Sequence, residues 1–178
     1  PEISDEYAIQ SAIGQGTNSY TVSQLNRYVT AVANRGTVYS LTLADRATDS
    51  AGNVVEDYQA EVVGTMDAVS ESTWDLVQEG MERMVEHSST FSGLDFSMAG
   101  KTGTAQQSAL HPDQALFVGY APADEPEISV AVRITYGYSS SYAAEIGRDI
   151  ARIYFEEDAA DEIITGKASV PGDAVSGD

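Results

Sequence analysis

Hydrophobic residues recur at helical spacing in three segments of the chain. The first opens at a capping box, Thr21-Val22-Ser23-Gln24, and stops at Gly36. Its apolar positions are Val22, Leu25, Val29 and Val32. The second runs from 71 to 87 and the third from about 141 to 156. The apolar stripe of the second is Trp74, Val77, Met81, Met84 and Val85. The third predicts inward positions at Ala143, Ile146, Ile150 and Tyr154.

Five other segments have the patterns of strands. Residues 37–46 alternate, and 54–63 read as their return strand after an Asp-Ser-Ala-Gly-Asn turn, which predicts a hairpin. An extended stretch at 96–106 follows the second helix. Residues 115–121 are apolar throughout, as in a strand buried on both faces. In 128–136 one face carries Ile128, Val130, Val132, Ile134 and Tyr136.

The order of these segments predicts an α+β fold. The last three strands are consecutive and joined by short connections, which favours a three-stranded antiparallel sheet flanked by helices. We assign residues 1–157 to one domain segment. Residues 158–178 are acidic and rich in small residues, so we expect a weakly structured tail there.

The net charge of the chain narrows the classes of binding partner that we expect. The 178 residues contain 28 acidic and 9 basic side chains, a formal net charge of −19. Such a surface repels phosphate backbones and anionic lipid head groups, so nucleic acid is excluded as an expected partner. The chain has no cysteine, which excludes disulfides and thiolate chemistry. No run of about 18 apolar residues is present.

Histidines offer little for a metal site. His87 ends the second helix, where it suits a role as a partner of the helix dipole. His111 lies in the loop after the 96–106 strand and is expected to be solvated. The two are far apart without ligand spacing, so we expect no metal. Tyr136, Tyr138 and Tyr142 surround a Gly-Ser-rich turn, where packing of the loop is the expected role.

One segment departs from the chemistry of its surroundings. Lys101 is one of only two lysines, and it stands among small neutral residues in a strand-like stretch, followed by Thr102, Gly103 and Thr104. A cation beside two hydroxyls suits a carboxylate ligand, and Gly103 lets a ligand approach the backbone. The alternative is an edge-strand lysine that prevents aggregation.

Gly-Lys-Thr also ends a phosphate-binding loop. That motif needs a glycine five residues before its last glycine, and this position is Asp95. The residues after the lysine do not open an amphipathic helix either. A nucleotide site is therefore not expected.

Lys101 to Gln106 resemble the third signature of the class B penicillin-binding proteins, the serine D,D-transpeptidases that cross-link peptidoglycan. Other segments are similar to this family in the same order: Ile13-Gly14-Gln15-Gly16, the helix opened by Thr21, the Trp74 helix, Phe117-Val118-Gly119-Tyr120-Ala121-Pro122 and the alternating 128–134. The resemblance covers nearly the whole chain. It implies the fold shared by penicillin-recognising transpeptidases and serine β-lactamases.

The resemblance assigns roles to the motif strand. Lys101 would help the electrostatics of the reacting serine. Thr102 and Thr104 would bind the carboxylate of the terminal D-alanine or of a β-lactam, and the Thr104 backbone N–H would be one oxyanion donor. Gly103 would keep the strand open to an extended peptide. No cofactor is implied.

Two family motifs are missing. The nucleophile of the family lies in Ser-x-x-Lys, but the positions three residues before Lys101 and Lys167 are Met98 and Ile164. Ser-x-Asn is also absent. Both motifs should lie before Pro1, so this segment alone is expected to be inactive.

The resemblance also implies a setting for the complete protein. It would be anchored in the bacterial cytoplasmic membrane with this domain outside, bind stem peptides and β-lactams, and work with the elongation or division machinery. Gly14-Gln15-Gly16 leans towards elongation. Alternatives are a serine β-lactamase, or a sensor or binding module of the same fold. Because two sheet strands of the family would be missing, the segment is expected to self-associate through 128–136.

Overall fold

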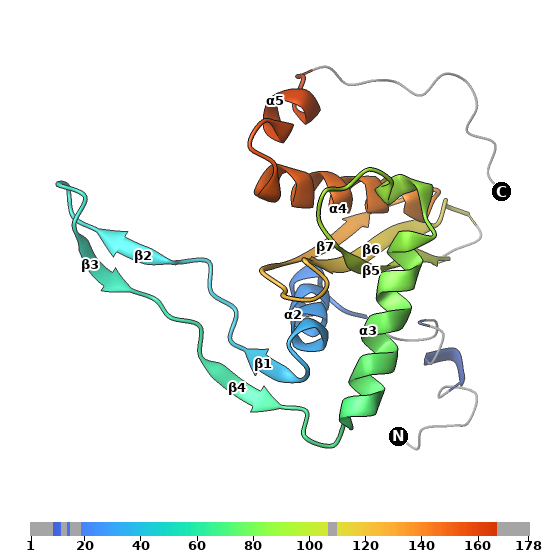
Figure 1. Ribbon diagram of the computed structural model, residues 1–178, viewed down its shortest axis with the longest axis horizontal. Coiled ribbons are helices and arrows are strands. Elements are labelled where there is room, and N and C mark those ends of the chain that lie inside the picture. The colour runs from blue at the N-terminus through green and yellow to red at the C-terminus, as the bar shows by residue number, and fades with distance from the viewer. Residues whose placement is uncertain (1–8, 12–13, 15–18, 107–109, 167–178) are drawn as a thin grey trace.

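A three-stranded antiparallel sheet forms the centre of the molecule. The computed structural model describes residues 9–11, 14, 19–106 and 110–166. The sheet has the order β5-β6-β7, and Figure 1 shows helices on both sides of it. Its strands are β5 (Ala99–Ala105), β6 (Gln114–Ala121) and β7 (Ile128–Ile134). The predicted α+β class and strand order are confirmed.

Helices cover both faces of this sheet. They are α2 (Val22–Ala33), α3 (Glu71–Glu86) and α4 (Ser140–Phe155), with a short 3₁₀ turn η1 (Ser89–Phe91) between α3 and β5. The predicted capping box opens α2: the Gln24 N–H donates to Thr21 Oγ1 at 3.1 Å, and the Thr21 N–H donates to Gln24 Oε1 at 2.8 Å. All three predicted helices are present.

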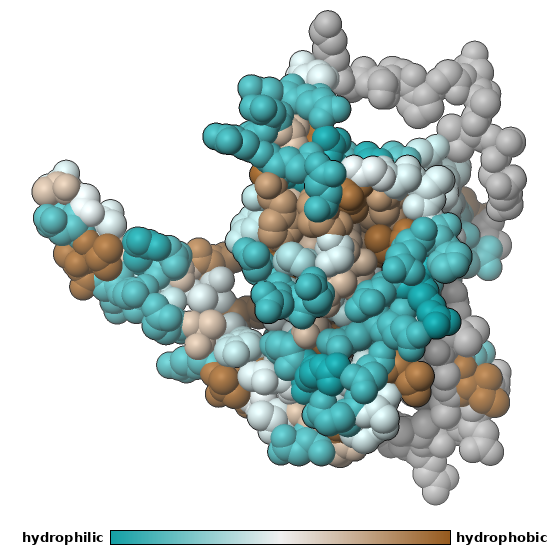
Figure 2. Space-filling view, viewed as in Figure 1, coloured by the Kyte–Doolittle hydropathy of each residue, from teal (hydrophilic) through white to brown (hydrophobic). Residues whose placement is uncertain are grey.

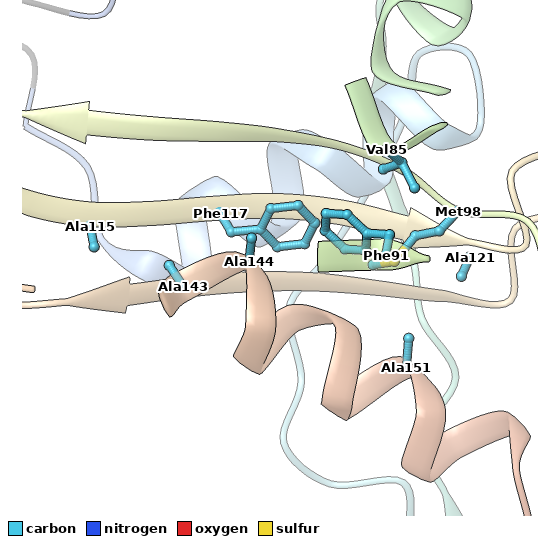
Figure 3. Packing of buried hydrophobic residues seen from close by; sticks show 9 residues of the cluster. All are labelled: Val85, Phe91, Met98, Ala115, Phe117, Ala121, Ala143, Ala144 and Ala151. Carbon is cyan, nitrogen blue, oxygen red and sulfur yellow. The ribbon is translucent and has the colours of Figure 1, made fainter. Parts of the chain in front are cut away.

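Two hydrophobic clusters hold the layers together. One lies between the sheet and α4, with η1 closing its end (Figure 3). Its buried members are Val85, Phe91, Met98, Ala115, Phe117, Ala121, Ala143, Ala144 and Ala151. The other lies between the opposite face and helices α2 and α3, and contains Val29, Val32, Trp74, Met81, Ala99 and Tyr120. The central strand β6 is thus largely buried on both faces, as the apolar run at 115–121 indicates.

The Phe117 ring occupies space left by three glycines. A Cβ atom added at Gly147 would lie 2.3 Å from Phe117 Cδ1, and one at Gly100 would lie 2.6 Å from Phe117 Cε2. At Gly119 the corresponding distance to Phe117 Cζ is 2.8 Å. Real Cβ atoms do not approach other atoms so closely, so the fully buried ring requires glycine at all three positions.

The inward face of α4 differs from the prediction. The side that meets the sheet is made of small residues, Ala143, Ala144, Gly147 and Ala151. Three predicted core positions are instead exposed: Ile146 and Ile150 at 43% and Tyr154 at 56%. Helical periodicity fits both the stripe of small residues and the stripe of large ones. The bulk of Phe117 decides between them, because α4 can approach the ring only with its small residues facing the sheet.

Two strand predictions also need correction. Tyr136 is not the end of the last strand: β7 stops at Ile134, and Tyr136 has a left-handed backbone with φ 56°. The predicted hairpin is present but each of its strands is broken in two. Its pieces are β1 (Thr37–Tyr39), β2 (Arg46–Thr48), β3 (Val54–Asp57) and β4 (Val62–Thr65). β1 pairs with β4 and β2 pairs with β3, and each pair carries a register shift. Figure 1 shows them as an arm that projects from the body.

The residues after α4 form more structure than the composition predicts. Ala159–Ile163 form the short helix α5, and Ala159 is buried. Arg152 on α4 holds this helix, because its guanidinium donates to Glu156 Oε2 at 2.8 Å and to Glu162 Oε2 at 2.6 Å. The rest of the predicted tail, 167–178, lies outside the described residues.

We predict that Gly147→Ala destabilises the protein by about 1–3 kcal/mol, because its methyl group would overlap the Phe117 ring. Gly80→Ala is the matched control. Gly80 lies exposed in α3 with no atom within 4 Å of an added Cβ, so alanine should stabilise the helix by about 0.5–1 kcal/mol. Urea unfolding measures both changes. Equal effects of the two substitutions would contradict the packing described here.

Tyr120 should make the fold sensitive to alkaline pH. Its hydroxyl is buried and forms no hydrogen bond, and burial raises the pKa of Tyr120 to about 12, with the negative charge of Glu82 adding to the shift. The unfolded chain ionises near pH 10 whereas the folded one does not, so stability falls as the pH rises from about 10 towards 12. Tyr120→Phe should keep stability at pH 7 and flatten this decline. The exposed Tyr28→Phe should leave the decline unchanged.

Candidate functional site

The lysine motif lies in the middle of β5. This strand pairs with β6 over its whole length, with Lys101 opposite Val118 and Thr104 opposite Ala115. Its other edge pairs with no strand among the described residues. A strand with one open edge presents backbone N–H and C=O groups to an extended ligand. The sequence therefore places the motif where a peptide can be added to the sheet.

Lys101 is a cation without a carboxylate partner in the described part of the chain. Its side chain is exposed, and Nζ donates to the Thr102 carbonyl oxygen at 2.8 Å. By contrast, five arginines in the same part form ion pairs: Arg35, Arg46, Arg83, Arg148 and Arg152. In a chain of net charge −19, a free cation at an open strand edge is available to an external anion.

The motif side chains divide between the two faces of β5. Successive side chains on a strand point to opposite faces, so Lys101 and Gly103 share one face and Thr102 and Thr104 share the other. The register places the threonines on the Phe117 face, towards α4. The cation and the hydroxyls therefore flank the open edge from two sides. A carboxylate bound at this edge can receive hydrogen bonds from both.

Glycine is present at positions 100 and 103 for different reasons. The fold itself requires Gly100, because of Phe117. At Gly103 an added Cβ would lie 3.4 Å from Leu116 Cβ, an ordinary contact, and the backbone is not left-handed. Packing does not explain glycine at 103. The family resemblance implies that Gly103 allows a ligand to approach the strand closely.

Two polar contacts lie near the motif strand, and the sequence analysis missed both. Before the strand, Ser97 Oγ donates to Asp124 Oδ1 at 3.0 Å and accepts from the Ala123 N–H at 2.9 Å. The serine hydroxyl lowers the pKa of Asp124. On the two neighbouring strands, Arg133 Nη2 of β7 donates to the buried Gln114 Oε1 of β6 at 3.0 Å. Since these partners are far apart in sequence, only the folded sheet shows the pairings.

The histidines lie apart from each other. The His87 ring nitrogen Nδ1 lies 2.8 Å from the Arg83 carbonyl oxygen, so His87 caps the end of α3 as expected. His111 is exposed and stacks on Tyr136, with ring centroids 4.9 Å apart. Among the described residues, no group of three or more His, Asp or Glu side chains could hold a metal ion.

A cavity of about 330 Å³ lies at the end of α3, lined by residues such as Glu86, Phe91 and Met98, and not by Lys101.

Comparison with known proteins identifies the family of this chain. The family model of the penicillin-binding protein transpeptidase domain matches residues 2–152. The chain belongs to this family. Penicillin-binding protein 2A of Bacillus subtilis is 33% identical over 172 residues, which cover 84% of this chain and 24% of that protein. Peptidoglycan D,D-transpeptidase MrdA of Acinetobacter baumannii is 31% identical over 163 residues, 80% of this chain and 23% of that protein.

Solved structures show the same fold. Pseudomonas aeruginosa PBP2, in complex with WCK 5153, matches with a TM-score of 0.63 and 30% identity over 81% of this chain and 32% of that one. The imipenem acyl-enzyme complex of Mycobacterium tuberculosis penicillin-binding protein A has a TM-score of 0.76 at 23% identity, over 88% of this chain and 36% of that one. The predicted resemblance to class B penicillin-binding proteins is thus confirmed. The transpeptidase segment spans about a quarter of the length of the curated relatives.

The 178-residue segment should not react covalently with penicillin. It contains no serine three residues before a lysine, which is the arrangement that activates the nucleophile in this family. We expect no stoichiometric adduct after incubation with fluorescent penicillin, measured by intact-mass spectrometry. A one-to-one adduct would contradict this and would identify a nucleophile of another kind.

Proposed function

We propose that this segment is the substrate-binding half of a peptidoglycan D,D-transpeptidase site. In the complete protein, a serine oxygen attacks the carbonyl carbon of the stem peptide and the terminal D-alanine leaves. An amine of a second stem peptide then takes the acyl group from the serine. Its relatives include proteins named peptidoglycan D,D-transpeptidase, which favours this reaction over β-lactam hydrolysis.

The observation that carries the proposal is the unpaired Lys101 on the open edge of β5. The lysine adds positive charge beside the reacting serine. The hydroxyls of Thr102 and Thr104 donate hydrogen bonds to the carboxylate of the donor peptide or of a β-lactam. The backbone N–H of Thr104 stabilises the oxyanion, together with that of the serine. Gly103 leaves room for the peptide to lie along the strand.

The proposal extends to the surroundings of the complete protein. PBP2 of Helicobacter pylori has been solved in complex with MreC, and several relatives are PBP2-type proteins. We infer that the complete protein works with the cell-wall elongation machinery, anchored in the cytoplasmic membrane with this domain outside. In the described part of the segment itself, no helix is long and apolar enough to span a membrane.

A β-lactam sensor of the same fold is the other candidate. It would bind or be acylated without turning over stem peptides, so Lys101 would serve both functions. Depletion of the complete protein separates them. Loss of growth or of cell shape supports the transpeptidase, and unchanged growth supports the sensor.

Lys101→Ala in the full-length protein should slow acylation by penicillin. Removing a charged hydrogen-bond donor from a desolvated site typically costs about 2–5 kcal/mol, or roughly thirty- to several-thousand-fold in rate. The second-order acylation rate measures the loss. The melting temperature should not change, because an exposed strand lysine contributes less than about 0.5 kcal/mol to stability.

Arg83→Ala is the matched control for this experiment. Arg83 is an exposed cation on α3 whose partner is Glu79, away from the motif strand. Its removal should leave acylation unchanged. If Lys101→Ala also leaves acylation unchanged, Lys101 is only a surface charge and the proposed site is wrong.

We also propose that the isolated segment self-associates through β7. Within the described residues β7 pairs only with β6, so its other edge is open, and the exposed Ile146 and Ile150 of α4 lie on the neighbouring layer. Sedimentation at tens of micromolar should detect dimers. A wild-type segment that remains monomeric would contradict the proposal.

A further inference from the structure

The arm formed by β1 to β4 exposes an unusual number of apolar side chains. Figure 2 shows brown, hydrophobic patches along it, separated from the body. Every residue of β3 and β4 is exposed. The exposed large apolar residues of the arm and its base are Leu41, Leu43, Val54, Val55, Tyr58, Val62, Val63 and Met66. A two-stranded ribbon with little buried surface is marginally stable by itself, so a partner would stabilise it.

The strand β3 has an order of side chains that one exposed face does not explain. Its sequence is Val54-Val55-Glu56-Asp57, so each face of the strand carries one valine followed by one acid. A ribbon with one face in water would alternate apolar and polar residues instead. Val54 and Val55 are 53% and 64% exposed. Each face of β3 therefore offers one apolar and one acidic side chain to a strand added at its edge.

One edge of β3 is available for such a neighbour. β3 pairs with β2 at one edge, and with no other strand in the described part of the chain. The tip of the arm is held in place, because Asp49 Oδ1 accepts hydrogen bonds from the Ala51 N–H at 2.8 Å and the Asn53 N–H at 2.9 Å. A fixed edge loses little conformational freedom when another strand is added.

The acids of β3 have no cationic partner within ion-pair distance among the described residues. Glu56 accepts a hydrogen bond from the Tyr58 hydroxyl at 2.7 Å, and Asp57 accepts one from Gln59 Nε2 at 2.9 Å, both neutral donors. Arg46 lies opposite Asp57 in the register and attracts it electrostatically, but its guanidinium hydrogen-bonds to Asp45. Residues 44–61 contain five acids and one arginine. The edge therefore attracts a basic segment.

We infer that the free edge of β3 binds an extended basic segment of a partner protein by strand addition. In the antiparallel orientation, the matching order along the partner is two basic residues followed by two apolar ones. This order places a lysine or arginine opposite Asp57 and Glu56, and a valine or isoleucine opposite Val55 and Val54. The inference does not depend on the proposed transpeptidase activity.

A second copy of β3 fits this edge poorly. Two antiparallel copies centred on the strand would place each valine opposite an acid: Val54 opposite Asp57, and Val55 opposite Glu56. Two parallel copies in register would place like charges side by side, which is destabilising. The partner is therefore a different, basic chain.

Fluorescence anisotropy with short labelled peptides tests this inference. The probe is acetyl-Thr-Lys-Lys-Val-Val-Thr-amide, and the comparison peptide carries Lys-Val-Lys-Val in place of Lys-Lys-Val-Val. We expect the first to bind at least fivefold more tightly, with amide exchange slowed in β3. The same peptide N-methylated at alternate residues should not bind, because it cannot donate the strand hydrogen bonds. Equal binding of all three peptides would overturn the inference.

Charge variants distinguish binding at the β3 edge from general attraction of a basic peptide to an acidic protein. Glu56→Lys with Asp57→Lys should weaken binding at least tenfold, while Glu125→Lys with Glu145→Lys, two exposed acids elsewhere, should change it less than twofold. Circular dichroism checks that both variants remain folded. Equal loss in both variants would overturn the inference. So would failure of the full-length protein to bind the probe, since its own chain would then cover the edge.

Discussion

The packing of the Phe117 ring against three glycines sets the distances between β5, β6 and α4. Gly100 and Gly119 face each other on neighbouring strands, and Gly147 brings α4 down onto the same ring. Because no side chain fits beside the ring, β5, β6 and α4 can approach in only one arrangement. This arrangement fixes the position of β5 relative to β6 and α4. It therefore also fixes the position of the lysine motif, which begins directly after Gly100.

The same packing leaves one edge of β5 open and the cation unpaired. The Ser97–Asp124 contact lies just before β5, and the Arg133–Gln114 contact joins β7 to β6 beside it. Lys101 has no carboxylate partner in the described residues, although acids outnumber bases threefold in the chain. We propose that this strand, with its open edge and free cation, is preorganised for an extended, anionic ligand. Preorganisation of this kind is what electrostatic catalysis requires.

Local patterns in the sequence predicted most of the elements, including the strand that carries the lysine motif. The Thr21–Gln24 capping box, the apolar run of β6 and the alternation of β7 each depend on near neighbours, so they could be recognised without the fold. The inward face of α4 could not, since it depends on the size of a ring on β6. The broken arm and the end of β7 before Tyr136 were missed for a similar reason: register shifts and left-handed residues leave only a weak trace in hydrophobic periodicity.

The central claim is that the open edge of β5 receives the carboxylate and the reacting carbonyl of the ligand. A crystal structure of the full-length protein acylated by penicillin tests it most directly. The account predicts the β-lactam carboxylate within about 2.6–3.2 Å of the Thr102 or Thr104 hydroxyl, and the acyl oxygen within about 2.7–3.2 Å of the Thr104 backbone nitrogen. An acylated structure in which the carboxylate is bound elsewhere, and Lys101 pairs with an acid of its own chain, would contradict it.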